Sequence, residues 1–183
     1  MNYLIISDIH GSADALRTVL NTHYFYDAII LVGDLLYHGP RNPILNDYDP
    51  ASVLKILNDL KVPILAVRGN CDSEVDQMVL DFSMMQDYSV LDYEGTKIFI
   101  THGHIIDPKD ALIKRHGDIF ISGHTHVHGI HYSQDGVVCI NPGSISMPKE
   151  RQEPTYALLS DHTISIYSLK HELKVSYKVK EPR

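Results

Sequence analysis

Short apolar runs rich in β-branched residues alternate with helical patterns through the first two thirds of the chain. These runs predict strands at residues 3–6, 28–32, 63–67, 97–101 and 118–122. Strands and helices that alternate in this way are typical of repeated strand-helix-strand units. The pattern therefore predicts an α/β domain.

Three helix starts can be identified between these strands. Ser12 can cap the first helix, and Asp49 is a favourable N-cap with Pro50 at the first helical position of the second. Asp107-Pro108 is a third start of the same kind. The apolar faces of the first two helices are Leu16, Val19 and Leu20, and Val53, Ile56, Leu57 and Leu60.

The pattern changes after residue 128 to short alternating strands at 136–140, 156–159, 163–167 and 173–179. They predict an antiparallel addition and hence a mixed sheet system. Residues 148–154, between two of these strands, read as a loose segment. No repeat or flexible linker marks a boundary, so a single domain over residues 1–183 is expected.

Composition narrows the function further. No run approaches the roughly 18 apolar residues that cross a bilayer, so no membrane partner is expected. Cys71 and Cys139 are the only cysteines, which favours a reducing cytoplasm over a disulfide framework. A net charge of −7 argues against extended nucleic acid and suits a compact phosphate ester, while twelve histidines direct attention to metal chemistry.

Polar motifs follow the carboxyl end of one predicted strand after another, where α/β sheets bind ligands. Carboxylate, imidazole and amide donors without paired cysteines suit manganese, iron or zinc in a hydrolytic site. Alone, Asp-x-His arises by chance and Gly-Asp is often only a turn, but the shared order of all the motifs favours a metal site. The motifs are Asp8-Ile9-His10, Gly33-Asp34, Gly69-Asn70, His102 and Gly123-His124-Thr125-His126.

The order D-x-H, G-D, G-N, H and G-H-x-H resembles the calcineurin-like metallophosphoesterase superfamily over most of the chain. The segments HGPRN, VRGNCDSEVDQM, THGH, GHTH and NPGS followed by MPK are similar to the YfcE family of small bacterial phosphodiesterases. The resemblance implies a four-layer α/β/β/α sandwich with two mixed β-sheets. It also implies a metal-dependent phosphodiesterase that hydrolyses small phosphodiesters.

The same resemblance implies a ligand set for two divalent ions, usually manganese, with nickel, zinc, iron or magnesium as alternatives. Two ions about 3.5–4 Å apart would activate a hydroxide for in-line attack on phosphorus. In this set Asp8, His10 and His126 hold the first metal, Asn70, His102 and His124 hold the second, and Asp34 bridges both.

Cys71 departs from the superfamily pattern, in which a histidine that assists the leaving group often follows the asparagine. Because cysteine is a poorer proton donor, the chain is expected to prefer esters with good leaving groups or to use a nearby side chain such as His38. The alternative is that Cys71 only fills the pocket. Arg41 and Arg68 can likewise hold a substrate phosphate or pair with local carboxylates.

Other histidines near the motifs, His104, His128 and His131, are expected to support the ligands or lie at the surface. Gly143 and Ser144 of NPGS are expected to form a tight turn beside the site. Competing functions are a noncatalytic scaffold, as in the retromer subunit of this fold family, and a nuclease or protein phosphatase. Exposed apolar strands in the C-terminal half are compatible with a homo-oligomer.

Overall fold

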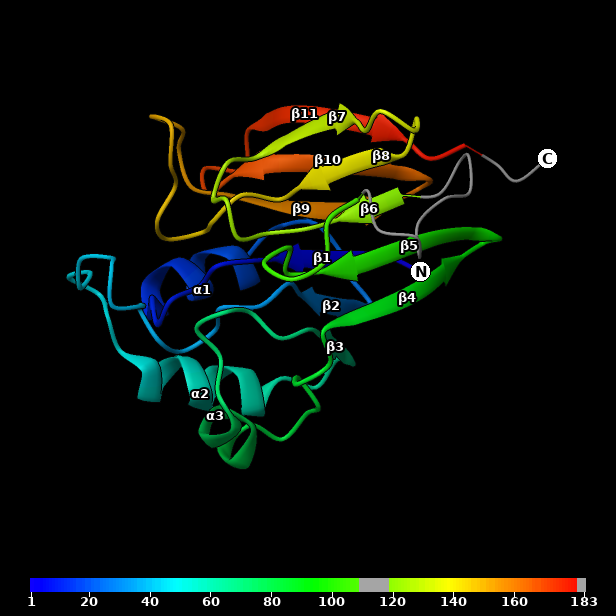
Figure 1. Cartoon of the computed structure of the whole chain (residues 1–183). Coiled ribbons are helices and arrows are strands. Elements are labelled where there is room, and N and C mark those ends of the chain that lie inside the picture. The colour runs from blue at the N-terminus through cyan, green and yellow to red at the C-terminus, as the bar shows by residue number, and fades with distance from the viewer. Residues whose placement is uncertain (109–118, 181–183) are drawn as a thin grey trace.

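The computed structural model describes residues 1–108 and 119–180 of the chain. Its strands form two stacked sheets, seen one in front of the other in Figure 1, and the apolar faces of the first two helices pack on one of them. In chain order they are β1 (Tyr3–Ile6), α1 (Ala13–Leu20), β2 (Ala28–Leu31), α2 (Pro50–Asp59), β3 (Ile64–Ala66), α3 (Glu74–Val79), β4 (Tyr88–Tyr93), β5 (Thr96–Thr101), β6 (Ile119–Ile121), β7 (Gly129–Tyr132), β8 (Val138–Asn141), β9 (Thr155–Ser160), β10 (Thr163–Ser168) and β11 (Leu173–Lys178).

Both sheets are mixed. The first has the strand order β11-β10-β9-β1-β2-β3, and the second has the order β4-β5-β6-β8-β7. Within each sheet three strands run parallel, β1, β2 and β3 in the first and β5, β6 and β8 in the second. The remaining strands pair antiparallel at the flanks.

Strand alternation divides the interior into layers. Leu4 and Ile6 of β1 pack with the apolar faces of α1 and α2, where Leu16 and Leu57 are buried. Ile5, between them in sequence, faces the second sheet and joins the core between the sheets. Because β1 is covered on both sides, it reads as a continuous apolar run in the sequence.

The predicted helix starts are confirmed for α1 and α2. The Ser12 Oγ accepts a hydrogen bond from the Ala15 amide at 3.4 Å, and Asp49 Oδ1 accepts one from the Ser52 amide at 2.9 Å. The helix expected from Asp107-Pro108 would lie in residues 109–118, outside the described part of the chain. Every helix in the described residues is too short or too polar to span a bilayer.

Among the described residues, sequence reasoning missed three elements, namely α3, β4 and β7. Helix α3 has six residues, none of them buried, so it shows no apolar stripe. In β4 the exposed positions alternate with half-buried ones until Tyr93, which gives only a weak strand pattern. The expected α/β fold with two mixed sheets is nevertheless confirmed.

Candidate metal centre

The seven predicted ligands come together at one end of the sandwich. Each lies in a loop that follows a strand: β1, β2, β3, β5 or β6. Since β1, β2 and β3 are parallel in one sheet and β5 and β6 are parallel in the other, the ligands follow strands from both sheets. We refer to the following seven residues as the centre: Asp8, His10, Asp34, Asn70, His102, His124 and His126.

The centre depends on an unusual backbone. Left-handed φ angles, which side chains other than glycine rarely adopt, occur at five of its residues. Backbone hydrogen bonds hold two of the loops together, because the Asp8 amide donates to Gly33 O at 3.1 Å and the His10 amide donates to Asp34 O at 3.0 Å. The φ angles are 53° at Asp8, 48° at His10, 57° at Asp34, 66° at His124 and 59° at His126.

Main-chain carbonyls orient three of the imidazole rings. The Nδ1 atoms of His10, His102 and His126 lie 2.9, 2.6 and 2.6 Å from the carbonyl oxygens of Tyr37, Val32 and Met147. A carbonyl can only accept, so each Nδ1 carries the proton and each Nε2 presents a lone pair when the ring is neutral. This is the arrangement that metal-binding histidines adopt.

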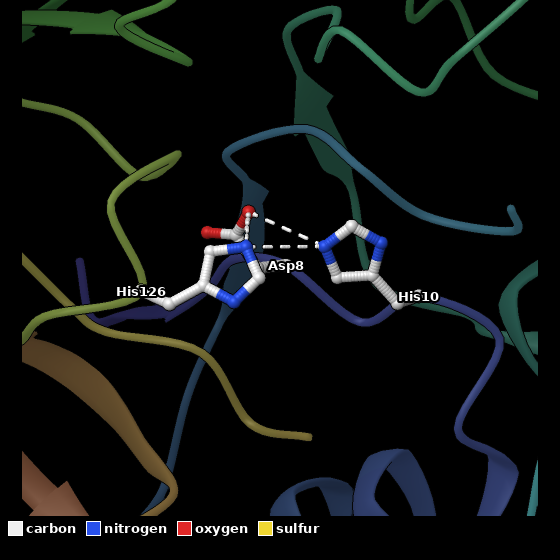
Figure 2. A group of neighbouring side chains, drawn as sticks. All are labelled: Asp8, His10 and His126. Carbon is white, nitrogen blue, oxygen red and sulfur yellow. Dashed lines mark hydrogen bonds and ion pairs between the residues drawn. The ribbon is translucent and has the colours of Figure 1, made fainter. Parts of the chain in front are cut away.

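The first cluster of the centre is formed by Asp8, His10 and His126 (Figure 2). The Nε2 atoms of the two rings face each other at 3.3 Å, and Asp8 Oδ1 lies 3.7 Å from that of His10 and 3.3 Å from that of His126. Asp8 is fully buried, and its Oδ1 has no hydrogen-bond partner among the described residues. Two lone pairs and a partnerless carboxylate oxygen around one point fit a cation.

The second cluster is built on the amide oxygen of Asn70. This Oδ1 lies 3.2 Å from His102 Nε2 and 2.7 Å from His124 Nδ1. Asp34 joins the two clusters, because its Oδ2 lies 3.6 Å from His10 Nε2 and 3.4 Å from His102 Nε2. The geometry thus brings all seven residues together. Asp8 Oδ1 also lies 3.9 Å from His102 Nε2, so the two clusters adjoin.

The charges of the centre are strongly coupled. Burial raises the pKa of Asp8 and Asp34, but the neighbouring histidines outweigh it and hold both carboxyl pKa values below their usual range. Burial lowers the pKa of His102, but the carboxylates of Asp34 and Asp8 outweigh it and raise this pKa to about 9. Without a metal, a proton on His102 therefore offsets part of the buried negative charge.

Asp72 supports the centre and was missed by sequence reasoning. Its carboxylate accepts the amides of Asp34 and Leu35 at 2.8 Å each and that of Gly69 at 2.7 Å. A Cβ added at Gly69 would collide with the carboxylate and the amide of Asp34. The loops after β2 and β3 are therefore packed backbone to backbone, and their contact fixes Asp34.

The NPGS segment supports Asp8, as expected for a turn beside the site. Ser144 Oγ and Ser146 Oγ donate to the Asp8 carbonyl at 2.7 and 3.1 Å. The other carboxylate oxygen of Asp8, Oδ2, accepts Ser7 Oγ at 2.6 Å and the His124 amide at 3.1 Å. Only Oδ1 of Asp8 is left to face the centre.

Cys71 and His38 take different places. Cys71 lines the cleft above the centre, where burial and the Asp34 and Asp72 carboxylates raise its pKa to about 12. His38 packs edge-on against Tyr37 and Tyr48, with ring centroids 4.7 and 5.1 Å away, and it is not among the cleft-lining residues that the structure describes. The catalytic roles of both stay predictions, and only Cys71 faces the cleft.

The two arginines and the remaining histidines near the motifs also differ in whether they reach the cleft. Arg41 lines the cleft, whereas Arg68 pairs with Asp87 at 3.5 Å. The His104 ring packs against His102 at 5.3 Å between centroids, and burial lowers its pKa. His131 lies exposed on β7.

The chain is similar in sequence to a known domain family and to curated bacterial proteins. Residues 1–163 match the Calcineurin-like phosphoesterase superfamily domain. The chain is 37% identical to phosphodiesterase YfcE of Escherichia coli over 171 residues, which cover 92% of each protein. It is 32% identical to the probable metallophosphoesterase YsnB of Bacillus subtilis, over 87% of this chain and 84% of that one.

Solved structures agree with these matches. YfcE from E. coli, described as a phosphoesterase, superposes with a TM-score of 0.92 at 34% identity, over 98% of this chain and 100% of that chain. Vps29 from Entamoeba histolytica, solved in complex with Zn²⁺, shares the fold with a TM-score of 0.62 at 20% identity, over 98% of this chain and 100% of that chain.

Proposed function

The chain belongs to the calcineurin-like phosphoesterase superfamily, and we propose that it is a phosphodiesterase whose centre binds two divalent metal ions. The proposed substrates are small phosphodiesters. Similarity to phosphodiesterase YfcE over most of both chains supports the reaction class.

One observation carries the metal part of the proposal. The Nε2 atoms of His10 and His126 face each other at 3.3 Å while their Nδ1 atoms are engaged by carbonyls. In neutral rings this sets two lone pairs against each other, which is unfavourable unless a metal cation or a shared proton lies between them. The partnerless Oδ1 of Asp8 faces the same point.

The arrangement also supports the division of ligands. Asp8, His10 and His126 would hold one ion, and Asn70, His102 and His124 would hold the other. Asp34 would bridge both, since its Oδ2 is nearly equidistant from His10 and His102. Such ions act as Lewis acids on a phosphoryl oxygen and lower the pKa of water to near 7.

The chain's own residues hold the proposed ligands in position. The carbonyls of Tyr37, Val32 and Met147 keep three imidazole rings in the binding tautomer, and Asp72 fixes the loop that carries Asp34. In the metal-free chain, burial and the carboxylates of Asp34 and Asp72 raise the pKa of Cys71 to about 12. As a neutral thiol, Cys71 can donate weakly to a leaving oxygen.

The cleft and its donor atoms support the proposed substrate size and choice of metal. Its volume of about 690 Å³ is that of a small-molecule site, and the net charge of −7 disfavours long nucleic acids. Imidazole, carboxylate and amide donors support manganese, with nickel, zinc, iron or magnesium as alternatives. The free thiols of Cys71 and Cys139 support a cytoplasmic location.

The test begins with metal-stripped protein assayed on bis(p-nitrophenyl) phosphate and p-nitrophenyl phosphate, with manganese, nickel, zinc or magnesium restored in turn. We expect manganese to restore hydrolysis of the diester in preference to the monoester. Asp34→Asn should abolish it, while Asp59→Asn, which alters an exposed carboxylate paired with Lys55, should not.

If the protein binds metal yet no metal restores turnover of either ester, the phosphodiesterase proposal is wrong. The noncatalytic scaffold then becomes the better reading, and protein partners replace esters as the object of study. Retained activity in Asp34→Asn would instead contradict the assignment of the bridging ligand.

A further inference from the structure

Two loops rise from the centre and form one rim of the cleft. Residues 37–42 contribute Arg41 and Asn42, and residues 147–152 contribute Lys149. We call Arg41 and Lys149 the rim cations; both side chains are exposed and both line the same cleft as the centre.

The rim loops are held in place by the centre itself. Tyr37 O and Met147 O, which orient His10 and His126, belong to these loops. The Lys149 amide also donates to His126 O at 3.1 Å. The rim cations are therefore carried by backbone that is tied directly to metal-ligand residues.

A side-chain contact joins the two rim loops. Lys149 Nζ donates to Asn42 Oδ1 at 3.4 Å, and Asn42 is the neighbour of Arg41 in sequence. Asn42 is anchored in turn by donating from Nδ2 to His38 O at 2.9 Å. Gly39, at φ +81°, brings the same loop against Cys71, whose sulfur lies 3.0 Å from the position of an added Cβ. The rim thus adjoins the reacting end of the cleft.

The charges of the rim cations are not neutralised by the protein. Within the described parts of the chain, no carboxylate forms an ion pair with Arg41 or Lys149, whereas Arg17 and Lys55 each have one and Lys174 has two. The carboxylates that do line the cleft, Asp34 and Asp72, are engaged by the centre and by backbone amides.

We propose that the rim cations bind a second anionic group of the substrate, so that the preferred phosphodiesters carry a phosphate or carboxylate on one of their alcohols. This inference rests on the phosphodiesterase function proposed above. Lys149 uses one of its three ammonium donors on Asn42, and an arginine offers five donors in a planar fork that suits such oxyanions.

Binding of two non-hydrolysable ligands tests the inference directly. The manganese-loaded protein is titrated calorimetrically with 2-carboxyethylphosphonate and with propylphosphonate, which differ by a carboxylate in place of a methyl group. We expect the carboxylate to tighten binding about tenfold, with each rim cation contributing about threefold, as partly exposed charge pairs do. Because these charges are exposed, the preference should shrink as sodium chloride is raised.

Variants assign the preference to the rim. Arg41→Gln and Lys149→Gln should each lower the ratio of the two Kd values, and the double variant should bring it close to one. Lys97→Gln removes the same charge from the exposed face of β5 and should leave the ratio unchanged. A variant that loses metal or folded protein should weaken both ligands equally, because both carry the phosphonate. Such losses therefore do not change the ratio of the two Kd values.

Equal Kd values in the unaltered protein, or a ratio that survives in the double variant, would overturn the inference. The second result would mean that the carboxylate contacts the metals or another wall of the cleft. Failure of the underlying function gives a different result: bis(p-nitrophenyl) phosphate is then not hydrolysed with any metal, whatever the Kd ratio.

Discussion

The centre and the rim share one cleft but are built in opposite ways. Asp8, His10 and His102 are buried, and their positions are set by backbone carbonyls and by packed loops. Arg41 and Lys149 are exposed, and the one side-chain hydrogen bond of Lys149 in the described residues is 3.4 Å long. The difference teaches that the geometry of the chemistry is fixed by main chain, while recognition is left to side chains that water screens.

The largest effect on the centre is expected from a methyl group at Gly69. Gly69→Ala places a Cβ in collision with the Asp34 carboxylate and amide, so the loop after β2 must shift. Because even supporting residues around a metal are worth 10- to 100-fold, we expect loss of more than about a hundredfold in kcat/KM and in metal affinity. Steady-state kinetics and metal analysis by mass spectrometry measure both.

A matched control exists on β7. The position of a Cβ at Gly129 has no atom within 4 Å, so Gly129→Ala should retain activity within about twofold. Normal metal content and activity in Gly69→Ala would show that the loop around Asp34 tolerates displacement, and the rigid view of the centre would then be wrong.

Metal binding at the centre, unlike anion binding at the rim, should depend on the protonation of a histidine. The raised pKa of His102, about 9, means that this ring is protonated at pH 7.5 in the metal-free protein. Metal must displace that proton, so affinity should rise about tenfold per pH unit as pH increases from 6.5 towards 8.5. Calorimetry in buffers of different ionisation enthalpy should detect release of at least one proton. No proton release at pH 7.5 would contradict the charge balance described for the centre.

The smallest effect is expected at Cys71, where the centre meets the rim. Cys71→Ala removes a weak proton donor, so hydrolysis of methyl phenyl phosphate, with a poor leaving group, should fall about two- to fivefold. Methyl p-nitrophenyl phosphate should be affected less. Cys139→Ala, in a cysteine buried within β8, controls for loss of a thiol. An unchanged rate and preference in Cys71→Ala would leave Cys71 as a pocket filler.

Local chemistry made much of the fold predictable. The apolar run of β1 and the caps Ser12 and Asp49 act over a few residues, and the structure follows them closely. Helix α3 was missed because it buries no side chain, although its capping box of Ser73 and Asp76 is a signal that the sequence contains. The division into two mixed sheets came from family resemblance, and the order of the strands was not predicted, because pairing between distant segments leaves no local pattern.

The residues of the site also differ in whether local sequence could predict them. The ligands were predictable because each is a metal-binding residue type placed after an apolar run. Asp72 was not, because its partners are backbone amides that only the folded loops bring together. Residues 148–154 were expected to be loose, yet Lys149 N donates to His126 O and Gln152 Oε1 accepts the His128 amide at 2.7 Å. Tertiary hydrogen bonds of this kind are invisible in composition.

The left-handed backbone at five residues of the centre has a consequence outside catalysis. Such conformations cost roughly 1 kcal/mol or more each, and several together are a large fraction of the 5–15 kcal/mol that stabilises a typical domain. Cations that bind only the folded chain offset that cost by mass action. We therefore expect the folded chain to resist heat and proteases better with divalent metal bound than without it.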